Sequence, residues 1–495
     1  MAKEKKMLVG FVWNYAAELK IMLTALLVLC TVATVLQFIS STFSISTSDL
    51  RLCISRIATA STNISEEAPP LVPPSMLSPP SLQPDQVLSN GVIKRSFIPY
   101  GAAAYNFISM SAYRGGLNTF TIIGLSSKPL HVYGRPSYPC QWVPEDPSQN
   151  TVTTAGNKML PDWGYGRVYT AVVIRCAFPA PINANNSGGK LLLHASTSGG
   201  GDTKYNSTDI IETLREPPGS VDFNVFNSPP KYDYWYCGAS LYGNLSPQRL
   251  REWIAYHVRL FGERSHFVLH DAGGVHEEVM EVLKPWMELG YVTLQDIREQ
   301  ERFDGYYHNQ FMVMNDCLHR YKFMAKWMFF FDVDEFIYVQ PKSTVKSVLD
   351  SMQGYSQFTI EQRPMSSQLC YDDEGPGRTY RKWGFEKLVY RDVKKVPRRD
   401  RKYAVQPRRI MAAGVHLSQH LHGKTYHSMD GKMKYFHYHG SISQRREPCR
   451  HLFNTTQLSF ENNPYILDTT LREAAGPVKK FELKMIGSRL HTTRQ

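Results

Sequence analysis

The sequence predicts an α/β protein with a Rossmann-like, mostly parallel sheet in its C-terminal half, preceded by a small all-β sandwich domain and an N-terminal transmembrane helix. Three observations predict this organisation. An uncharged apolar run stands near the N-terminus, strand-like alternation fills residues 91–216, and strand and helix patterns alternate from residue 217 onward. With 495 residues and 42% hydrophobic content, the chain can bury more than one core.

The apolar run covers residues 21–39 and contains no charged side chain. At about 1.5 Å per residue it can cross a hydrocarbon core of roughly 30 Å. Four lysines precede it and favour a cytoplasmic N-terminus: Lys3, Lys5, Lys6 and Lys20. We therefore expect a cytoplasmic tail (1–20), a signal anchor (21–40) and a lumenal remainder, as in a single-pass type II membrane protein. A cleaved signal peptide is the alternative, but its apolar region would be shorter and followed by a small-x-small cleavage site.

Residues 41–90 are rich in Ser and Pro and predict an extended stem, because such a composition buries too little apolar surface to offset its ordering entropy.

Of the eight cysteines, six follow the stem, and an oxidising lumen permits disulfides among them in any of fifteen pairings. Cys53 in the stem is either a free thiol or a bridge in a homodimer. Five Asn-x-Ser/Thr sequons agree with a lumenal location: Asn63, Asn185, Asn206, Asn244 and Asn454.

The β region, residues 91–216, contains three segments with clear strand character, residues 117–125, 166–178 and 190–194, separated by Gly, Pro and Asn turns. A small sandwich resembling a carbohydrate-binding module is the predicted structure. Its aromatic side chains either stack on sugar rings or pack in the core and loops. They are Trp142, Trp163, Tyr165, Tyr105 and Tyr133.

Residues 217–495 alternate between strand and helix patterns, beginning with strand 232–237 and a helix that Ser246 caps, Pro247 starts and Gly262 stops. Strands 267–269 and 291–294 follow, and a helix is expected over residues 306–326. In a parallel sheet the ligand lies beyond the carboxyl ends of the strands. The loop at residues 242–244, Asp271 and the carboxylates described next should therefore converge, although an Asp before two glycines is also an ordinary turn.

Residues 327–336 form an apolar run that delivers two carboxylates, Asp332 and Asp334, to one point. Such a run predicts a buried strand, and because strand side chains alternate, both carboxylates should project to the same side at its end. Two hard oxygen ligands suit Mn²⁺ or Mg²⁺ holding a phosphate. A solvated Asp-rich turn is the alternative, and the preceding aromatic strand argues against it.

An Asp-x-Asp at the end of a buried strand is typical of type-A glycosyltransferases that use nucleotide sugars. Over residues 232–449 the chain resembles glycosyltransferase family 92 in several motifs together: Gly-Asn-Leu-Ser at 243–246, Glu-Trp-Ile at 252–254, Asn-Asp-Cys-Leu at 315–318, Asp-Val-Asp-Glu-Phe at 332–336, Gly-Val-His at 414–416 and His-Tyr-His at 437–439. Its stem and β domain are similar to the plant branch of that family, the pectic β-1,4-galactan synthases. The resemblance implies a Golgi membrane enzyme that transfers galactose from UDP-galactose to the end of a galactan side chain.

The resemblance also implies site roles. Type-A enzymes often complete the metal site with a late His, so His439 is the first candidate, His437 the second and His416 a weaker third, with a buried structural His as the alternative. The donor is expected to contact four residues: Tyr242, Asn244, Asp271 and Asp332. The donor is an α-glycoside and the implied product is β-linked, so the anomeric carbon inverts, which a single displacement achieves. Such a displacement needs only one general base. Asp372, Asp373 and Glu374, in a glycine-flanked loop, and Glu361 are the candidates, and no spacing rule selects among them.

The net charge of +12 arises largely from the basic run at residues 394–402 together with Arg408 and Arg409. A lumenal location excludes nucleic acid, so this run is either a pectin-attracting surface or a solvated basic loop. Two other functions remain as alternatives to a galactosyltransferase. They are a non-catalytic carbohydrate-binding protein and a family 92 transferase with another donor or acceptor. A glycosidase is disfavoured because its two carboxylates flank the bond at least about 5 Å apart, whereas Asp332 and Asp334 lie two residues apart in sequence.

Overall fold

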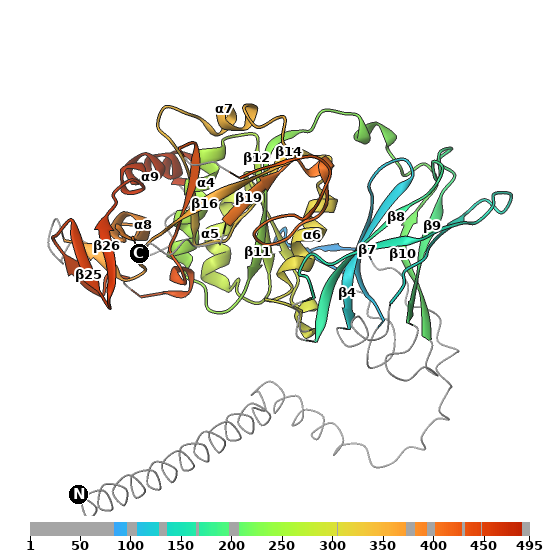
Figure 1. Ribbon diagram of the computed structural model, residues 1–495, viewed down its shortest axis with the longest axis horizontal. Helices are drawn as coiled ribbons and strands as arrows, with labels where there is room; N and C mark the ends of the chain where they lie inside the picture. The colour runs from blue at the N-terminus through green and yellow to red at the C-terminus, as the bar shows by residue number, and fades with distance from the viewer. Residues whose placement is uncertain are drawn as a thin grey trace, which may run out of the picture. The chain divides into compact units, whose positions relative to one another are not determined.

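The computed structural model describes residues 84–96, 106–127, 136–164, 168–197, 207–303, 305–372, 382–393, 401–427, 431–446 and 448–487 (Figure 1). The expected cytoplasmic tail and signal anchor, and nearly all of the stem, lie outside these residues. Within them, no helix combines the length and hydropathy that a membrane span needs. The chain divides into two compact units, residues 1–77 and 78–495, and everything described below belongs to the second.

A large mixed sheet of eleven strands forms the centre of this unit. Strands β2, β13, β12, β11 and β14 run parallel to one another, whereas β19 is antiparallel to both β14 and β16. The order is β1 (Gln86–Val87), β2 (Ile93–Lys94), β13 (Val292–Asp296), β12 (Ser265–Asp271), β11 (Tyr232–Leu241), β14 (Ala325–Phe330), β19 (Arg401–Val405), β16 (Gln357–Pro364), β23 (Met433–His437) and β15 (Glu335–Val339), and β22 (Thr425–Tyr426) pairs with β16. The expected α/β architecture with a largely parallel sheet is confirmed.

Helices cover both faces of this sheet because the strands are apolar on both sides. On β14, Trp327 and Phe329 belong to the cluster that contains α4 (Pro247–Phe261) and α5 (Glu277–Glu288). The alternate residues, Met328 and Phe330, belong to the cluster that contains α6 (Gln310–Arg320). Helix α4 begins as predicted, with the Ser246 side chain accepting from Arg249 N, and ends at Gly262, whose φ is 78°.

Two predicted elements are wrong in their extent. The apolar run at 327–336 is not one strand, because β14 ends at Phe330 and β15 starts at Glu335. The intervening turn closes through two hydrogen bonds between Asp332 and Glu335. The helix expected over 306–326 is limited to α6, because Tyr307, His308 and Asn309 have φ values of 53–57°, a left-handed conformation that cannot continue into a right-handed helix.

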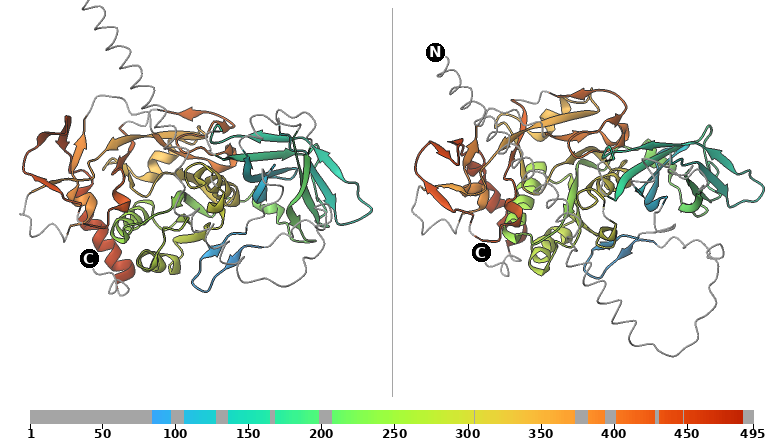
Figure 2. Two further views of the ribbon diagram at one scale, coloured as in Figure 1. Left: turned by 90° about the horizontal axis from the view of Figure 1, so that it is seen from below. Right: turned by 60° about the horizontal axis from the view of Figure 1, so that its bottom comes forward.

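Before the large sheet's first long strand, the chain forms two antiparallel sheets of four strands, in the order β3-β4-β8-β7 and β10-β9-β5-β6 (Figure 2). Side chains from both sheets share one hydrophobic cluster, and Cys140 and Cys176 form a disulfide between them. Their bounds are β3 (Ile108–Arg114), β4 (Thr119–Ser127), β5 (Cys140–Pro144), β6 (Val152–Thr154), β7 (Gly156–Met159), β8 (Tyr169–Ala177), β9 (Gly189–Thr197) and β10 (Ser207–Glu216).

Of the two alternatives for the aromatic side chains, Trp142 follows the packing one. Trp142 is 2% exposed and stacks on Phe120 inside the cluster shared by the two sheets. Trp163, in contrast, is 59% exposed. The other three aromatic candidates, at positions 105, 133 and 165, lie outside the described residues.

Helix α6 lies between the large sheet and the sheet β3-β4-β8-β7, and it contacts both β11 and β4 (Figure 1). Met312 and Val313 of α6 share a hydrophobic cluster with Ile108, Leu125 and Ala171. The β sheets are therefore packed directly against the helix that precedes β14.

The remaining elements lie at the β15 side of the large sheet and at its α6 side. Disulfides join Cys237 to Cys317 and Cys370 to Cys449, so all six cysteines within the described residues are paired. The elements are α7 (Val345–Asp350), α8 (Gly384–Lys387), α9 (Arg472–Ile486), and the small sheets β17 (Leu369–Tyr371) with β24 (His451–Phe453), β18 (Tyr390–Asp392) with β26 (Asn463–Leu467) and β25 (Gln457–Phe460), and β20 (Ile410–Ala412) with β21 (His420–Leu421).

Candidate active site

The turn between β14 and β15 presents Asp332 and Asp334, and buried groups fix its backbone. The Tyr236 hydroxyl donates to Phe331 O at 2.8 Å, and Trp253 Nε1 donates to Glu335 O at 2.9 Å. Both donors are themselves buried. The geometry of the turn is therefore imposed by β11 and α4, which pack beneath it.

Asp332 is held from the α6 side of the sheet. Its Oδ1 accepts from Gln310 Nε2 at 3.3 Å, and its Oδ2 accepts from Lys402 Nζ at 2.6 Å. Gln310 is the first residue of α6, and Lys402 is a buried residue of β19. The expectation that Lys402 lies in a solvated basic run is wrong, because this lysine is inside the site.

Asp334 is held from the β23 side. Gly440 N donates to its Oδ2 at 3.0 Å, and His437 Nε2 lies 3.6 Å from its Oδ1. Burial opposes the charged form, but His437, the Gly440 N–H and Lys402 together hold the pKa of the Asp334 carboxyl below its usual value. Burial also opposes charging of His437, yet Asp334 and Glu335 raise the pKa of this imidazole.

A third carboxylate, Glu335, completes an acidic cluster. Its Oε2 accepts from Asp332 N at 2.8 Å and lies 3.6 Å from Lys402 Nζ. Burial raises the pKa of Glu335, Lys402 opposes this rise, and the nearby Asp332 and Asp334 add to it. Three carboxylates thus face one ammonium group, which leaves the cluster with a negative field suited to a cation.

The two candidate histidines do not lie on one strand, because β23 ends at His437 and His439 lies beyond it. His439 is exposed, with its ring 5.3 Å from that of His437. His437 contacts the amide of Gln362 through Nδ1, and in the described structure Gln362 Oε1 is buried without a partner. Rotating this amide by 180° lets Oε1 accept from Nδ1–H and leaves His437 Nε2 as a free acceptor, the arrangement of a metal-bound imidazole.

This chemistry fits a hard divalent cation, with Asp332, Asp334 and His437 as the ligand set. Among the described residues, no three His, Cys, Asp or Glu side chains already converge as a complete metal shell. Lys402 contributes to this arrangement, since its ammonium group donates a hydrogen bond to Asp332 Oδ2, one of the oxygens that would bind the cation.

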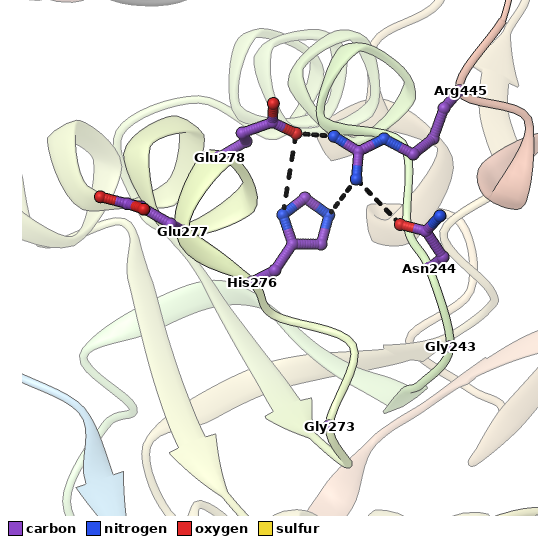
Figure 3. Close-up of a pocket in the computed structure, with 7 residues that line it drawn as sticks. All are labelled: Gly243, Asn244, Gly273, His276, Glu277, Glu278 and Arg445. Atoms are coloured by element: carbon purple, nitrogen blue, oxygen red, sulfur yellow. Dashed lines mark hydrogen bonds and ion pairs between the residues drawn. The ribbon is translucent and has the colours of Figure 1, made fainter.

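A pocket of about 590 Å³ opens beside the carboxyl ends of β11 and β12 (Figure 3). Arg445 reaches across it, where its Nη1 donates to Asn244 Oδ1 at 2.9 Å and its Nη2 pairs with Glu278. Gly243 and Gly273, with φ values of 71° and 95°, supply the turns on either side. The loops that follow β11 and β12 both line this pocket, through Asn244 and Gly273, whereas Asp332 and Asp334 are not among its lining residues.

The other predicted donor residues lie at the same edge. Tyr242 stacks on His308 with ring centroids 3.8 Å apart, and burial is the main cause of its raised pKa, to which Tyr307, Asp332 and Asp334 also contribute. Asp271 accepts from Gly273 N at 2.9 Å and from Val275 N at 3.1 Å, so its carboxylate shapes the loop that lines the pocket.

The candidate bases occupy different places. Asp372 follows β17, and its N donates to Phe453 O, while Asp373 and Glu374 lie outside the described residues. Glu361 belongs to β16, next to Gln362, and because strand side chains alternate it faces the opposite side of the sheet from the amide that contacts His437.

Sequence reasoning missed four residues of this site: Gln310, Glu335, Lys402 and Arg445. Glu335 stands within the Asp-Val-Asp-Glu motif, where a third carboxylate was a usable signal. Lys402 and Gln310 carry no such signal, because the sheet and α6 bring them to Asp332 from 70 and 22 residues away along the chain.

An acidic turn at the end of a central strand and a pocket at the same edge of a mostly parallel sheet are compatible with a glycosyltransferase. Comparison with family models matches residues 232–474 to glycosyltransferase family 92. The chain belongs to this family.

The relatives extend the match across the whole chain. The galactan beta-1,4-galactosyltransferase GALS3 of Arabidopsis thaliana is 65% identical over 499 residues, covering 100% of this chain and 98% of its own. GALS2 of the same plant is also 65% identical, over 514 residues and with the same coverage. GALS1 is 47% identical over 403 residues, or 80% of this chain and 79% of its own.

Proposed function

We propose that this protein is an inverting galactosyltransferase that moves galactose from UDP-galactose to the ends of β-1,4-galactan side chains of pectin. The observation that carries the proposal is the 65% identity to two galactan beta-1,4-galactosyltransferases over the entire chain. The pocket that Asn244 and Arg445 line, together with the carboxylates of Asp332 and Asp334 at the end of β14, supports it with groups of suitable chemistry.

The reaction is a single displacement. The 4-hydroxyl oxygen of the terminal galactose forms a bond to C1 of the donor sugar while the bond from C1 to the diphosphate oxygen breaks, so the α-linkage becomes β and UDP leaves. The hydroxyl proton passes to a carboxylate base. The loop of Asp372, Asp373 and Glu374 is favoured over Glu361 for this base, because Glu361 faces away from His437.

Donor binding is assigned to the pocket edge. Tyr242, Asn244, Asp271 and Asp332 keep the roles predicted for them, and Arg445 adds a guanidinium suited to bidentate contact with a phosphate. Arg445 pairs with Glu278 in the described structure, so binding of the diphosphate exchanges one anionic partner for another.

Mn²⁺ or Mg²⁺ is the proposed cofactor, held by Asp332, Asp334 and His437, with His439 as the second choice of imidazole. When bound, the ion neutralises the leaving diphosphate. Lys402 holds Asp332 in place and balances part of the negative charge of the cluster.

We further propose that residues 21–40 anchor the protein in the Golgi membrane with its catalytic domain in the lumen. The two four-stranded sheets are proposed to be a β-sandwich that binds carbohydrate, for which the shared core and the exposed Trp163 are the support.

Release of UDP tests the proposal against its alternatives. The full-length protein is incubated with UDP-galactose, UDP-glucose or UDP-arabinose, with and without a galactan oligosaccharide and with and without Mn²⁺. Acceptor-stimulated UDP release with UDP-galactose and Mn²⁺ is expected. A carbohydrate-binding protein releases no UDP with any donor, and a family 92 enzyme of different specificity releases UDP faster from another donor.

A further inference from the structure

Three tyrosines border the candidate site, and two of them face solvent. Tyr306 and Tyr307 are 41% and 57% exposed, and both lie in the loop before α6. Tyr242 contacts Tyr307 edge-on, with ring centroids 6.0 Å apart, and shares a hydrogen bond with it. We call the two exposed side chains, Tyr306 and Tyr307, the tyrosine platform.

The backbone under this platform is unusual. Tyr307, His308 and Asn309 are three successive residues in the left-handed backbone conformation. Residues other than glycine rarely adopt this conformation, and when they do it is mostly as single residues. Ser240 Oγ donates to His308 O at 2.7 Å, and Asn309 Nδ2 donates to Gln300 O at 2.9 Å. A conformation held this firmly against its intrinsic cost is typical of functional sites.

Different elements connect the platform and the pocket to the carboxylates of Asp332 and Asp334. Asp332 is bound by Gln310, three residues after Tyr307. Asp334 is bound by Gly440, which precedes Arg445 of the pocket by five residues. Tyr242 stands between them, because its ring contacts the platform and the next residue lines the pocket.

We propose that the tyrosine platform is the acceptor subsite, on which the terminal galactose residues of a β-1,4-galactan stack. This inference rests on the proposed function. A galactopyranose ring presents an apolar face of C–H groups, and exposed aromatic rings bind such faces while their hydroxyl groups remain in contact with water. Several adjacent exposed rings suit a chain of sugars, whereas a single nucleotide base suits a pocket.

The position of the platform agrees with a chain acceptor. Tyr306 lies 5.7 Å from Phe311, and Phe311 packs against the cluster formed with β3, β4 and β8. The platform therefore adjoins the point where the β sheets meet the catalytic domain, so a galactan leaving the platform has a surface of the β sheets beside it.

Variants of the full-length protein test the subsite. Tyr307→Asn removes the ring and keeps a residue type that tolerates the left-handed conformation, and Tyr306→Ala removes the neighbouring ring outside the left-handed run. Tyr307→Phe keeps the stacking surface. Leu483→Ala, which removes a 64% exposed side chain on α9, is the matched control.

The measured quantities are KM for galactan oligosaccharides of two to eight residues, KM for UDP-galactose, and the melting temperature. Tyr307→Asn and Tyr306→Ala should each raise KM for the longer acceptors by about tenfold, which equals about 1.4 kcal/mol. KM for UDP-galactose should stay within about twofold, as should every constant of Tyr307→Phe and Leu483→Ala.

Two results would overturn the proposal. If KM for UDP-galactose rises and KM for the acceptor does not, the platform holds the nucleotide base. If neither constant changes in a variant that melts like the parent, the tyrosines bind no substrate. If Tyr307→Asn melts at a lower temperature than the parent, the KM values of Tyr306→Ala alone test the proposal. A parent that transfers no galactose contradicts the proposed function instead, and galactan binding to parent and Tyr307→Asn by calorimetry then tests the platform separately.

Discussion

One buried lysine allows three carboxylates to share the turn after β14. Lys402 Nζ lies 2.6 Å from Asp332 Oδ2 and 3.6 Å from Glu335 Oε2, and its side chain is 3% exposed. Burial opposes its charge, but these carboxylates raise the pKa of Lys402, so it stays protonated at neutral pH. Asp332 and Asp334 still present carboxylate oxygens at the turn, which are the ligands that a hard divalent cation prefers.

His437 should contribute more to metal binding than His439. His437→Ala removes the imidazole beside Asp334 and should weaken Mn²⁺ binding by at least about tenfold, while His439→Ala, an exposed position, should stay within about twofold. Calorimetric titration of each variant with Mn²⁺, without substrates, measures this directly. If His439→Ala weakens Mn²⁺ binding more than His437→Ala does, His439 and not His437 is the metal ligand.

Among the elements, α6 connects the parts of the protein. Gln310 at its start binds Asp332, and Asp316 near its end is fully buried and accepts hydrogen bonds from Ser111 and Tyr113 of β3, each at 2.6 Å. Arg95, in the segment after β2, pairs with the same carboxylate. One helix thus joins the candidate site to the β sheets.

Asp316→Asn should destabilise the protein most clearly at neutral pH. Burial raises the pKa of the Asp316 carboxyl, but Arg95, Arg320 and Ser111 lower it far more, so its folded-state pKa lies below its unfolded value of about 3.9. Its stabilisation is therefore complete above about pH 5 and is lost as the pH falls toward and through the folded-state pKa. We expect a loss of about 3–5 kcal/mol at pH 7, because the buried Arg95 loses its fully buried charged partner and keeps only the partly exposed Asp85 as an ion-pair partner.

Melting temperature measured between pH 3 and pH 8 tests this prediction. The difference between parent and Asp316→Asn should be constant from pH 8 to about pH 5 and should shrink in stronger acid. Asp350→Asn, which breaks an exposed ion pair with Lys346, should follow the parent throughout. A difference that does not depend on pH would show that the ionised carboxylate is not the source of the stability.

The elements also show what sequence patterns can and cannot reveal. Helix α4 was predictable in full, because Ser246, Pro247 and Gly262 are local signals at its ends. The start of α6 was not, because His308 and Asn309 tolerate the left-handed conformation without requiring it, as a glycine at a turn would. Asp332 and Asp334 were recognisable from their spacing after an apolar run, whereas Lys402 reaches them through strand pairing between β14 and β19.

At the scale of the whole described molecule, the two antiparallel sheets and the catalytic domain are packed together. One of these sheets shares a hydrophobic cluster with α6 and the loop before it. A carbohydrate-binding surface on the sheets would therefore stay at a fixed distance from the catalytic turn, which raises the effective concentration of a long acceptor there.

Variants of two tryptophans distinguish a sugar-binding role from a packing role. Trp163→Ala should leave the melting temperature near that of the parent and should slow elongation of long galactans more than of short ones. Trp142→Ala should instead cost about 3–5 kcal/mol of stability, because it empties part of the core. Thermal melting and elongation assays on acceptors of graded length measure both. Equal elongation of all lengths by folded Trp163→Ala would remove this residue from the acceptor surface.

Product analysis of one variant tests the central claim, that Asp332 and Asp334 form the galactosyl-transfer site. Parent and Asp334→Asn are incubated with UDP-galactose, Mn²⁺ and a galactan oligosaccharide, and mass spectrometry and NMR identify the product. The parent should add hexoses in β-1,4 linkage. Asp334→Asn should melt like the parent and lose most of this turnover, about a hundredfold or more, because the variant loses a proposed ligand of the metal ion that neutralises the leaving diphosphate. Transfer by Asp334→Asn at the parental rate would contradict the account.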